Sequence, residues 1–328
     1  MEPVIYFNRA FRPEREATVS VRSRARNYGL GCFAGIRGYK TDDGRQVHVF
    51  RLDRHVRRLE HSARILRLRL SGPPSEIADV IVELLRRNEM RGDVYIRPIV
   101  FANSNELSPL LEAETSETAI FCMPIGRYLS AEPIDVCVSS WWRVRETAIP
   151  ARAKATGGYL NSALARREAM DNGYTEAILL TEDGHVSEGS AEHVFIVRDG
   201  QLISPPSTAD NLDGITRQSL ITLAREDLDI PFVERPIGRT ELYVADEVFL
   251  CGTGAEVTPV RSVDRRTVGD GLIGPVTRRL SERFEAVVRG RVLARLGWLT
   301  PVWSVKDDVA TALCGSGPIE AVHQRGSS

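Results

Sequence analysis

The spacing of apolar residues along the first third of the chain predicts strands that alternate with helices. The predicted strands cover residues 4–8, 17–21, 94–101 and 119–125. Apolar residues recur at helical spacing over 53–69 and 74–89, as the series Ile77, Val80, Ile81, Leu84 and Leu85 illustrates. The segment 124–133 has a proline at each end and a polar middle, so we interpret it as a linker between two domains.

The second part of the chain shows the same two kinds of pattern. Predicted strands cover 134–140, 176–181, 193–197, 202–204, 246–251 and 256–260, and predicted helices cover 159–171, 215–227 and 275–289. Short strands with tight turns between them predict an α+β fold with mixed and antiparallel sheets. We therefore expect a smaller N-terminal α/β domain over 1–123, the linker 124–133, a larger domain over 134–302 and a poorly ordered polar tail over 303–328.

Composition narrows the class of protein. The net charge of −1 argues against a protein that binds nucleic acid or a membrane surface, and no apolar run reaches the ~18 residues that span a bilayer. The N-terminus carries an early acid and no basic leader, from which we expect no secretory signal. The five cysteines are scattered without Cys-x-x-Cys spacing and the histidines lack metal-ligand spacing, so we expect a cytoplasmic protein without a metal site.

Lysine is rare in this chain, because only Lys40, Lys154 and Lys306 occur among 43 basic residues. Arginine cannot replace an amine that must lose its proton and attack a carbonyl, so each lysine is a candidate nucleophile. Lys40 lies in a polar turn and Lys306 in the polar tail. Lys154 is flanked by small residues, which leave room for a ligand beside its amine.

Four elements of a pyridoxal-phosphate site have candidates in the sequence. Lys154 is the candidate Schiff-base amine, and Glu188 is the candidate partner of a pyridinium nitrogen. The segment 213–220 predicts a helix start whose free N–H groups suit a phosphate. The planar guanidinium of Arg58 is a further candidate ligand of that phosphate. Tyr159 is the candidate donor to the ring oxygen. Each signal alone fits an ordinary surface or core residue, and their order along the chain is the specific feature.

That order resembles the class IV (fold-type IV) aminotransferases, and within them the branched-chain amino acid aminotransferases. The similarity runs from about residue 4 to residue 302. The matching motifs are N-Y-G-L-G-C-F-A-G-I-R-G-Y (27–39), R-L-D-R-H-V-R-R-L-E-H-S-A (51–63), V-Y-I-R-P-I-V-F (94–101), A-K-A-T-G-G-Y-L (153–160), V-S-E-G (186–189), L-D-G-I-T-R (212–217), C-G-T-G-A-E-V-T-P-V (251–260) and G-W-L (297–299).

The resemblance implies pyridoxal 5′-phosphate (PLP) as cofactor and assigns a role to each matching residue. Lys154 would be the catalytic residue that carries the cofactor. The other implied cofactor contacts are Arg58, Tyr159, Glu188, Leu212, Ile215, Thr216 and Thr253. The implied substrate contacts are Tyr28, Phe33, Arg37, Tyr95, Arg97, Tyr128, Thr253, Gly254 and Ala255. Among these, the resemblance implies that Arg37, Tyr95 and Arg97 bind the distal carboxylate of glutamate or 2-oxoglutarate.

By the same resemblance, the protein would transfer the amino group of branched-chain L-amino acids to 2-oxoglutarate. It would be a homodimer or a hexamer, with residues 103–111 of a partner subunit closing the site. Four residues depart from the family pattern, namely Ala34 for a glutamate, Ile125 for a bulky aromatic, His193 for an asparagine and Gly254 for an alanine. Ala34, Ile125 and Gly254 are expected at or near the substrate pocket, so they bear on the substrate and not on the cofactor.

Two alternatives stand beside this reading, and the departures bear on the first. A class IV relative with another substrate would be a D-amino acid transaminase, an (R)-amine transaminase or aminodeoxychorismate lyase. A degenerate relative would be a non-catalytic binding protein, although Lys154, Glu188, Tyr159 and Thr216 are all present.

Overall fold

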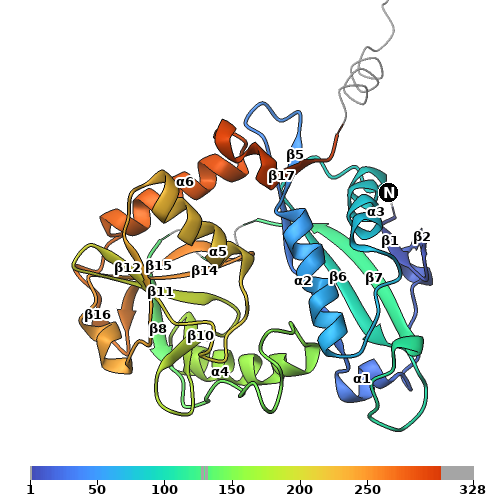
Figure 1. The fold of residues 1–328 in the computed structure, drawn as a ribbon, viewed down its shortest axis with the longest axis horizontal. Helices are drawn as coiled ribbons and strands as arrows, with labels where there is room; N and C mark the ends of the chain where they lie inside the picture. The colour runs from blue at the N-terminus through green and yellow to red at the C-terminus, as the bar shows by residue number, and fades with distance from the viewer. Residues whose placement is uncertain (1, 127–128, 130–131, 304–328) are drawn as a thin grey trace, which may run out of the picture.

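Two β-sheets, each covered by helices, make up the described part of the chain (Figure 1). The computed structural model describes residues 2–126, 129 and 132–303. Residue 1, four positions of the predicted linker (127, 128, 130 and 131) and residues 304–328 lie outside the described residues. The combination of helices with one antiparallel and one mixed sheet is the α+β class that the sequence predicts.

The first sheet, called here the N-terminal sheet, has eight strands among the described residues, and all its pairings are antiparallel. The strands are β1 (Val4–Phe7), β2 (Ala10–Pro13), β3 (Gly31–Phe33), β4 (Ile36–Lys40), β5 (Val47–Phe50), β6 (Val94–Ala102), β7 (Ser116–Pro124) and β17 (Leu299–Pro301). Their order is β17-β5-β4-β6-β7-β1-β2, with β3 paired to β6. The helices of this part are α1 (Arg24–Tyr28), α2 (Leu52–Ile65) and α3 (Pro74–Arg87).

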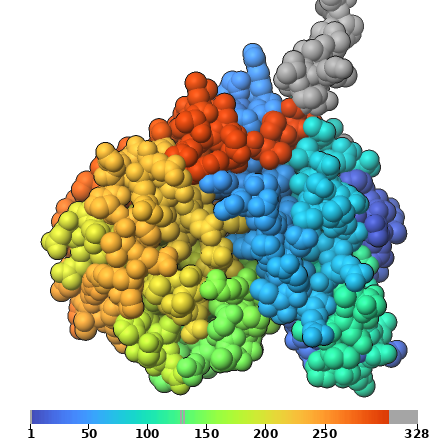
Figure 2. All heavy atoms as spheres, in the orientation of Figure 1, coloured from blue at the N-terminus to red at the C-terminus, as the bar shows by residue number. Residues whose placement is uncertain are grey.

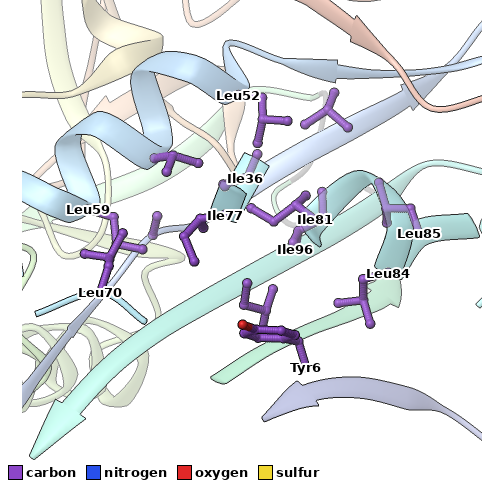
Figure 3. Packing of buried hydrophobic residues seen from close by; sticks show 14 of the residues in the cluster. Tyr6, Ile36, Leu52, Leu59, Leu70, Ile77, Ile81, Leu84, Leu85 and Ile96 are labelled. Atoms are coloured by element: carbon purple, nitrogen blue, oxygen red, sulfur yellow. The ribbon is translucent and has the colours of Figure 1, made fainter. Parts of the chain in front are cut away.

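Helices α2 and α3 lie on one face of the N-terminal sheet because each carries an apolar stripe. Figure 3 shows Leu52 and Leu59 of α2, Ile77 and Ile81 of α3 and Ile96 of β6 within one apolar cluster. All five side chains are almost completely buried. Burying a side chain of this size contributes ~1.5–3 kcal/mol, so this cluster holds α2 in place and with it Arg58.

The second sheet, called here the C-terminal sheet, is mixed and has nine strands among the described residues. The strands are β8 (Ile134–Val138), β9 (Glu176–Leu180), β10 (Val186–Gly189), β11 (His193–Arg198), β12 (Gln201–Ser204), β13 (Phe232–Glu234), β14 (Glu247–Gly252), β15 (Glu256–Val263) and β16 (Arg266–Thr267). Their order is β10-β9-β8-β15-β14-β11-β12-β13, with β16 paired to β15. The pairs β8–β9, β8–β15 and β12–β13 are parallel.

Three helices cover the C-terminal sheet. They are α4 (Tyr159–Asp171), α5 (Ile215–Thr222), which continues as a π-helical turn over Leu223–Asp227, and α6 (Pro275–Val288). Short 3₁₀ helices cover Glu14–Glu16, Ala113–Thr115, Thr156–Gly158, Arg239–Tyr243 and Leu293–Trp298. Glu247 caps α6, because its carboxylate accepts hydrogen bonds from the backbone N–H groups of Val276 and Thr277 at 2.9 and 2.7 Å. The helices predicted over 159–171, 215–227 and 275–289 are confirmed by α4, by α5 with its π-helical turn, and by α6.

The C-terminal end of the described chain returns to the N-terminal sheet. Strand β17 pairs with β5, where Leu299 lies opposite Phe50, and Figure 2 shows the red C-terminal segment lying across the top of both halves. Trp303, which the sequence pattern assigns to the polar tail, is buried, and the guanidinium of Arg91 stacks on its ring. The packed chain thus extends at least to residue 303, and the domain boundaries themselves stay a prediction.

One predicted strand is wrong. Residues 17–21 form no strand, and the side chains of Val19 and Val21 are 41% and 76% exposed. Among the described residues, no strand pairs with this segment, so its alternating apolar side chains are not buried against a sheet. In the same described part of the chain, no helix is long and apolar enough to cross a membrane.

Candidate active site

A cavity of about 730 Å³ opens between the two sheets. Its lining comes from both, and Figure 2 shows the blue N-terminal half lying directly against the green and yellow half. The N-terminal half contributes Phe33, Gly35, Arg58, Tyr95, Arg97, Ile99, Met123 and Ile125. The C-terminal half contributes Lys154, Tyr159, His193, Leu212 and the starts of α5 and of the 252–255 turn.

Lys154 is held by backbone contacts with the N-terminal half. The N–H of Phe33 donates to the Lys154 carbonyl at 3.1 Å, and Cys32 forms a β-bridge with Ala155. The hydroxyl of Thr156 donates to the Gly29 carbonyl at 2.6 Å. These contacts fix the backbone on both sides of the lysine, so its side chain projects into the cavity from a rigid base.

The amine of Lys154 lies 5.3 Å from the ring centroids of both Phe33 and Tyr159. Burial lowers its pKa to about 8, and the positive charge of Arg58 acts in the same direction. A substantial fraction of the amine is therefore neutral near neutral pH, which is the form that attacks a carbonyl. Burial also raises the pKa of the Tyr159 phenol to about 12, so this group remains a hydrogen-bond donor.

Glu188 lies at an irregularity in β10, where the register with β9 shifts between Val186 and Glu188. Such a bulge re-aims a side chain relative to its neighbours. The Oε1 atom of Glu188 pairs with Nη2 of Arg143 at 2.8 Å, and Oε2 accepts the Leu212 N–H at 3.2 Å. Nδ1 of His193 lies 3.6 Å from the same Oε2. The carboxylate is therefore buried among donors that stabilise its charge.

The start of α5 has the features that suit an anion. Gly214 is the N-cap residue in an extended conformation, and Ile215 and Thr216 begin the helix, where backbone N–H groups have no intrahelical acceptor. Arg58 reaches this helix start from α2, because its Nη1 donates to the Asp213 carbonyl at 3.0 Å. Burial lowers the pKa of Arg58 to about 10, which still leaves it charged at neutral pH.

Tyr95 and Arg97 project from β6 at the opposite side of the cavity. The Tyr95 hydroxyl accepts from Nε and Nη2 of Arg97 at 3.1 and 2.6 Å, and the Arg97 guanidinium lies 4.4 Å from the Phe33 ring centroid. A Cβ at Gly35 would lie 2.6 Å from the Tyr95 hydroxyl, so a glycine is required for this arrangement. The result is a cationic group beside an apolar surface.

Most of the predicted site residues line this cavity. Those that do are Phe33, Arg58, Tyr95, Arg97, Lys154, Tyr159, Leu212, Ile215, Thr216, Thr253, Gly254 and Ala255. Glu188 lines an adjoining smaller hollow that shares Lys154, Tyr159, His193 and Leu212 with it. Thr253 approaches from the turn after β14, and its hydroxyl donates to the Gly35 carbonyl at 3.1 Å. Ile125 and Gly254, two of the departures, also line the cavity.

Arg37 does not line the cavity, contrary to its predicted role at the distal carboxylate. Its buried guanidinium lies 3.4 Å from Glu256 and 3.8 Å from Asp93, and it donates to the carbonyls of Gly254 and Gly126. Paired with two acids, this arginine braces the 252–255 turn from behind.

Two further positions differ from expectation, and one cannot be placed. Tyr28 is absent from the lining, and its hydroxyl donates to the Leu107 carbonyl at 2.5 Å, within the 103–111 loop. Ala34 is fully buried in the N-terminal core and does not reach the pocket edge. Tyr128 lies outside the described residues.

Sequence reasoning missed Arg143 and Glu192. Arg143 follows two tryptophans in a loop after β8, where no spacing pattern marks it as the partner of Glu188. Glu192 lines the far end of the cavity, and burial together with the neighbouring Glu176 raises its pKa. No group of three or more potential metal ligands occurs in the part of the chain that the structure describes.

Known proteins share this architecture. A model of the amino-transferase class IV family matches residues 31–263. A probable branched-chain-amino-acid aminotransferase of Aquifex aeolicus is 44% identical over 299 residues, which cover 91% of this chain and 96% of that protein.

Solved structures agree with the family match. The branched-chain amino acid aminotransferase of Escherichia coli superposes with a TM-score of 0.88 at 40% identity, covering 92% of this chain and 100% of that one. The branched-chain amino acid aminotransferase from Thermobaculum terrenum in its PLP-form has a TM-score of 0.87 at 40% identity, with 92% and 99% covered. The chain belongs to the class IV aminotransferase family.

Proposed function

We propose that this protein is a PLP-dependent branched-chain amino acid aminotransferase that uses 2-oxoglutarate as amino acceptor. The observation that carries the proposal is the buried Lys154 amine, with its pKa lowered to about 8, in a cavity that also holds the cationic Arg97 on an apolar wall. The relatives named as branched-chain aminotransferases support the same substrate class.

The residues of the cavity fit PLP. An amine, a buried carboxylate among donors and a helix start beside an arginine match the aldehyde, the ring nitrogen and the phosphate of this cofactor. Lys154 would hold the aldehyde carbon, Glu188 the ring nitrogen and Tyr159 the ring oxygen. Arg58, Ile215, Thr216 and Thr253 would hold the phosphate, and Leu212 would pack on the ring. The relative solved in its PLP-form supports this assignment.

When bound, PLP supplies the electron sink that makes the substrate Cα proton removable. The amine of Lys154 takes and returns that proton, and its lowered pKa suits it to both roles near neutral pH. Glu188 is held in place by its ion pair with Arg143 and by the N–H of Leu212, which donates to it. Tyr159 remains a donor, since its raised pKa keeps the phenol protonated.

Two substrates must share one pocket in this reaction. In the complete reaction, L-leucine and 2-oxoglutarate give 4-methyl-2-oxopentanoate and L-glutamate, and the two substrates occupy the pocket in turn. Phe33, Met123 and Ile125 offer an apolar surface for the branched side chain, while Arg97 and the Tyr95 hydroxyl offer donors for the distal carboxylate. The 252–255 turn is proposed to receive the α-carboxylate common to both.

We further propose that the protein is a homodimer or higher homo-oligomer of the cytoplasm. Trp141, Trp142, Leu160 and Leu164 are 44%, 58%, 69% and 37% exposed, and they lie on α4 and on the loop that contacts it. Leu107 in the 103–111 loop is 78% exposed. Such apolar surface is typical of an interface between subunits. The described cysteines are free thiols, as in proteins of a reducing compartment.

The visible absorption spectrum of the purified protein tests the proposed function. A band of lysine-bound cofactor should bleach on addition of L-leucine and return on addition of 2-oxoglutarate. D-Leucine, an (R)-amine and aminodeoxychorismate serve as comparison donors. If one of these compounds bleaches the band and L-leucine does not, the protein has another class IV activity. If no band forms after PLP is supplied, the proposal is refuted.

A further inference from the structure

His193 occupies an unusual position between the two ends of the proposed cofactor site. It is the first residue of β11 and is buried, and it lines both the main cavity and the adjoining hollow. Its Nδ1 lies 3.6 Å from Oε2 of Glu188. Its Nε2 edge faces Gly214 so closely that a Cβ built on that glycine would overlap the imidazole ring.

The surroundings of His193 define its charge and orientation. Burial lowers the pKa of the imidazole well below its ordinary value, and the nearby cations Arg217, Lys154, Arg58 and Arg143 lower it further. The ring is therefore neutral, with one N–H to donate. The carboxylate of Glu188 favours that proton on Nδ1, which leaves the bare Nε2 edge against the backbone of Gly214.

The segment from Leu212 to Gly214 is thus joined to Glu188 in two ways. One is the hydrogen bond from the Leu212 N–H to Oε2, and the other runs through the imidazole of His193. Glu188 is the proposed partner of the ring nitrogen, and Gly214 begins the proposed phosphate-binding turn. A rigid ring placed between them sets their separation.

We propose that His193 is a positioning residue whose imidazole, wedged between Glu188 and Gly214, holds the ring-nitrogen carboxylate and the phosphate-binding turn at a fixed separation. The two ends of the cofactor are then bound as one unit. This inference rests on the proposed function, because it assumes PLP as the ligand. In this role His193 acts through its two neighbours, Glu188 and Gly214.

The contact with Gly214 is tested by a double-mutant cycle on PLP affinity, measured by titrating the apoenzyme. Gly214→Ala should weaken PLP by about tenfold or more, because its new Cβ overlaps the imidazole. Affinity for pyridoxal, which lacks the phosphate, should change far less. In His193→Asn/Gly214→Ala the shorter side chain clears the space, so PLP affinity should recover. Additive losses in the double variant would overturn the wedge.

The contact with Glu188 is tested with His193→Leu, which keeps apolar volume and removes the N–H. This variant should weaken PLP by about tenfold. The affinity for an analogue of PLP with carbon in place of the ring nitrogen should fall less, because this analogue has no ring nitrogen for Glu188 to bind. Equal losses for both ligands would reduce His193 to a packing role. His193→Asn keeps a donor near the position of Nδ1. In this variant PLP should again bind more tightly than the analogue, as in the wild-type protein.

His185→Asn is the matched control, since His185 is exposed on a turn beside Asp183. It should leave every affinity unchanged. Thermal unfolding of each apoenzyme identifies a variant that fails to fold, and the comparison of the two ligands in His193→Leu then decides the inference. If the wild-type protein itself takes up no PLP, the proposed function fails. If it binds PLP and the variants match it, only this inference fails.

Discussion

The two sheets contribute unlike walls to the same cavity. The wall from the C-terminal sheet carries Lys154, Tyr159 and His193, with Glu188 in the adjoining hollow, together with the helix start at Gly214. The wall from the N-terminal sheet carries Phe33, Tyr95, Arg97 and Ile125, which offer shape and one cationic group. Arg58 is the exception, because it crosses from α2 to the start of α5, where its Nη1 donates to the Asp213 carbonyl.

The difference between the walls suggests that one wall serves proton transfer and the other serves substrate recognition. Groups on the C-terminal wall are buried among one another, and several of their pKa values are shifted, as expected where protons are moved. On the N-terminal wall, a guanidinium lies against aromatic rings, which suits recognition of either an apolar or an anionic side chain. Changes on the first wall should affect every substrate alike, and changes on the second should affect substrates differently.

The largest effect is expected from Lys154→Ala on the C-terminal wall. Loss of the amine removes both the proposed cofactor anchor and the proton carrier, so the transamination rate should fall by ~10³-fold or more for all substrates. Steady-state rates with L-leucine and L-glutamate as donors measure this. Lys40→Ala, at the exposed end of β4, is the matched lysine control and should behave as wild type. Undiminished turnover in Lys154→Ala would exclude it as the nucleophile.

Arg37→Ala should reveal a structural residue behind the N-terminal wall. It leaves the buried Glu256 and the half-buried Asp93 with one cation fewer and frees the Gly254 carbonyl, so the free energy of unfolding should fall by about 3 kcal/mol. Urea unfolding of the apoenzyme measures the loss. The activities with leucine and with 2-oxoglutarate should decline together, and a selective loss of 2-oxoglutarate would return Arg37 to the anion-binding role.

Arg97→Ala should separate the two substrates. The variant keeps the apolar wall and loses the guanidinium, so kcat/KM for 2-oxoglutarate should fall by about 10- to 100-fold while the half-reaction with L-leucine changes little. Single-turnover measurements with each substrate provide the comparison. Equal losses would show that Arg97 supports the pocket without reading the carboxylate.

A change is also expected from pH alone, without any substitution. Because burial lowers the pKa of Lys154 to about 8, the neutral amine grows about tenfold per pH unit below that value and levels off above it. The rate at which the apoenzyme captures PLP should therefore rise up to about pH 8 and then flatten. Stopped-flow absorbance between pH 6 and pH 10.5 measures the profile. A rise that continues toward the ordinary lysine value of 10.5 would contradict the buried environment.

The sequence by itself determined the elements whose signals are local. Helices α2, α3 and α6 lie close to their predicted ranges, because an apolar stripe repeats along each. Helix α4 (Tyr159–Asp171) occupies its predicted range as well, although it buries only small residues such as Ala165 and Ala169. Motif order likewise predicted which residues would meet at the cavity, since Lys154, Tyr159, Leu212, Thr216 and Thr253 all line it.

Tertiary structure alone decided the features that depend on distant partners. Residues 17–21 alternate like a strand but pair with no strand of the described chain, and Leu299–Pro301 becomes a strand only because β5 offers an edge. Arg37 looks equivalent to Arg97 in the sequence, yet Asp93 and Glu256 hold it behind the pocket. The contact of His193 with Gly214 joins residues that are far apart in the chain. Sequence spacing records which groups are present, and packing decides which of them face one another.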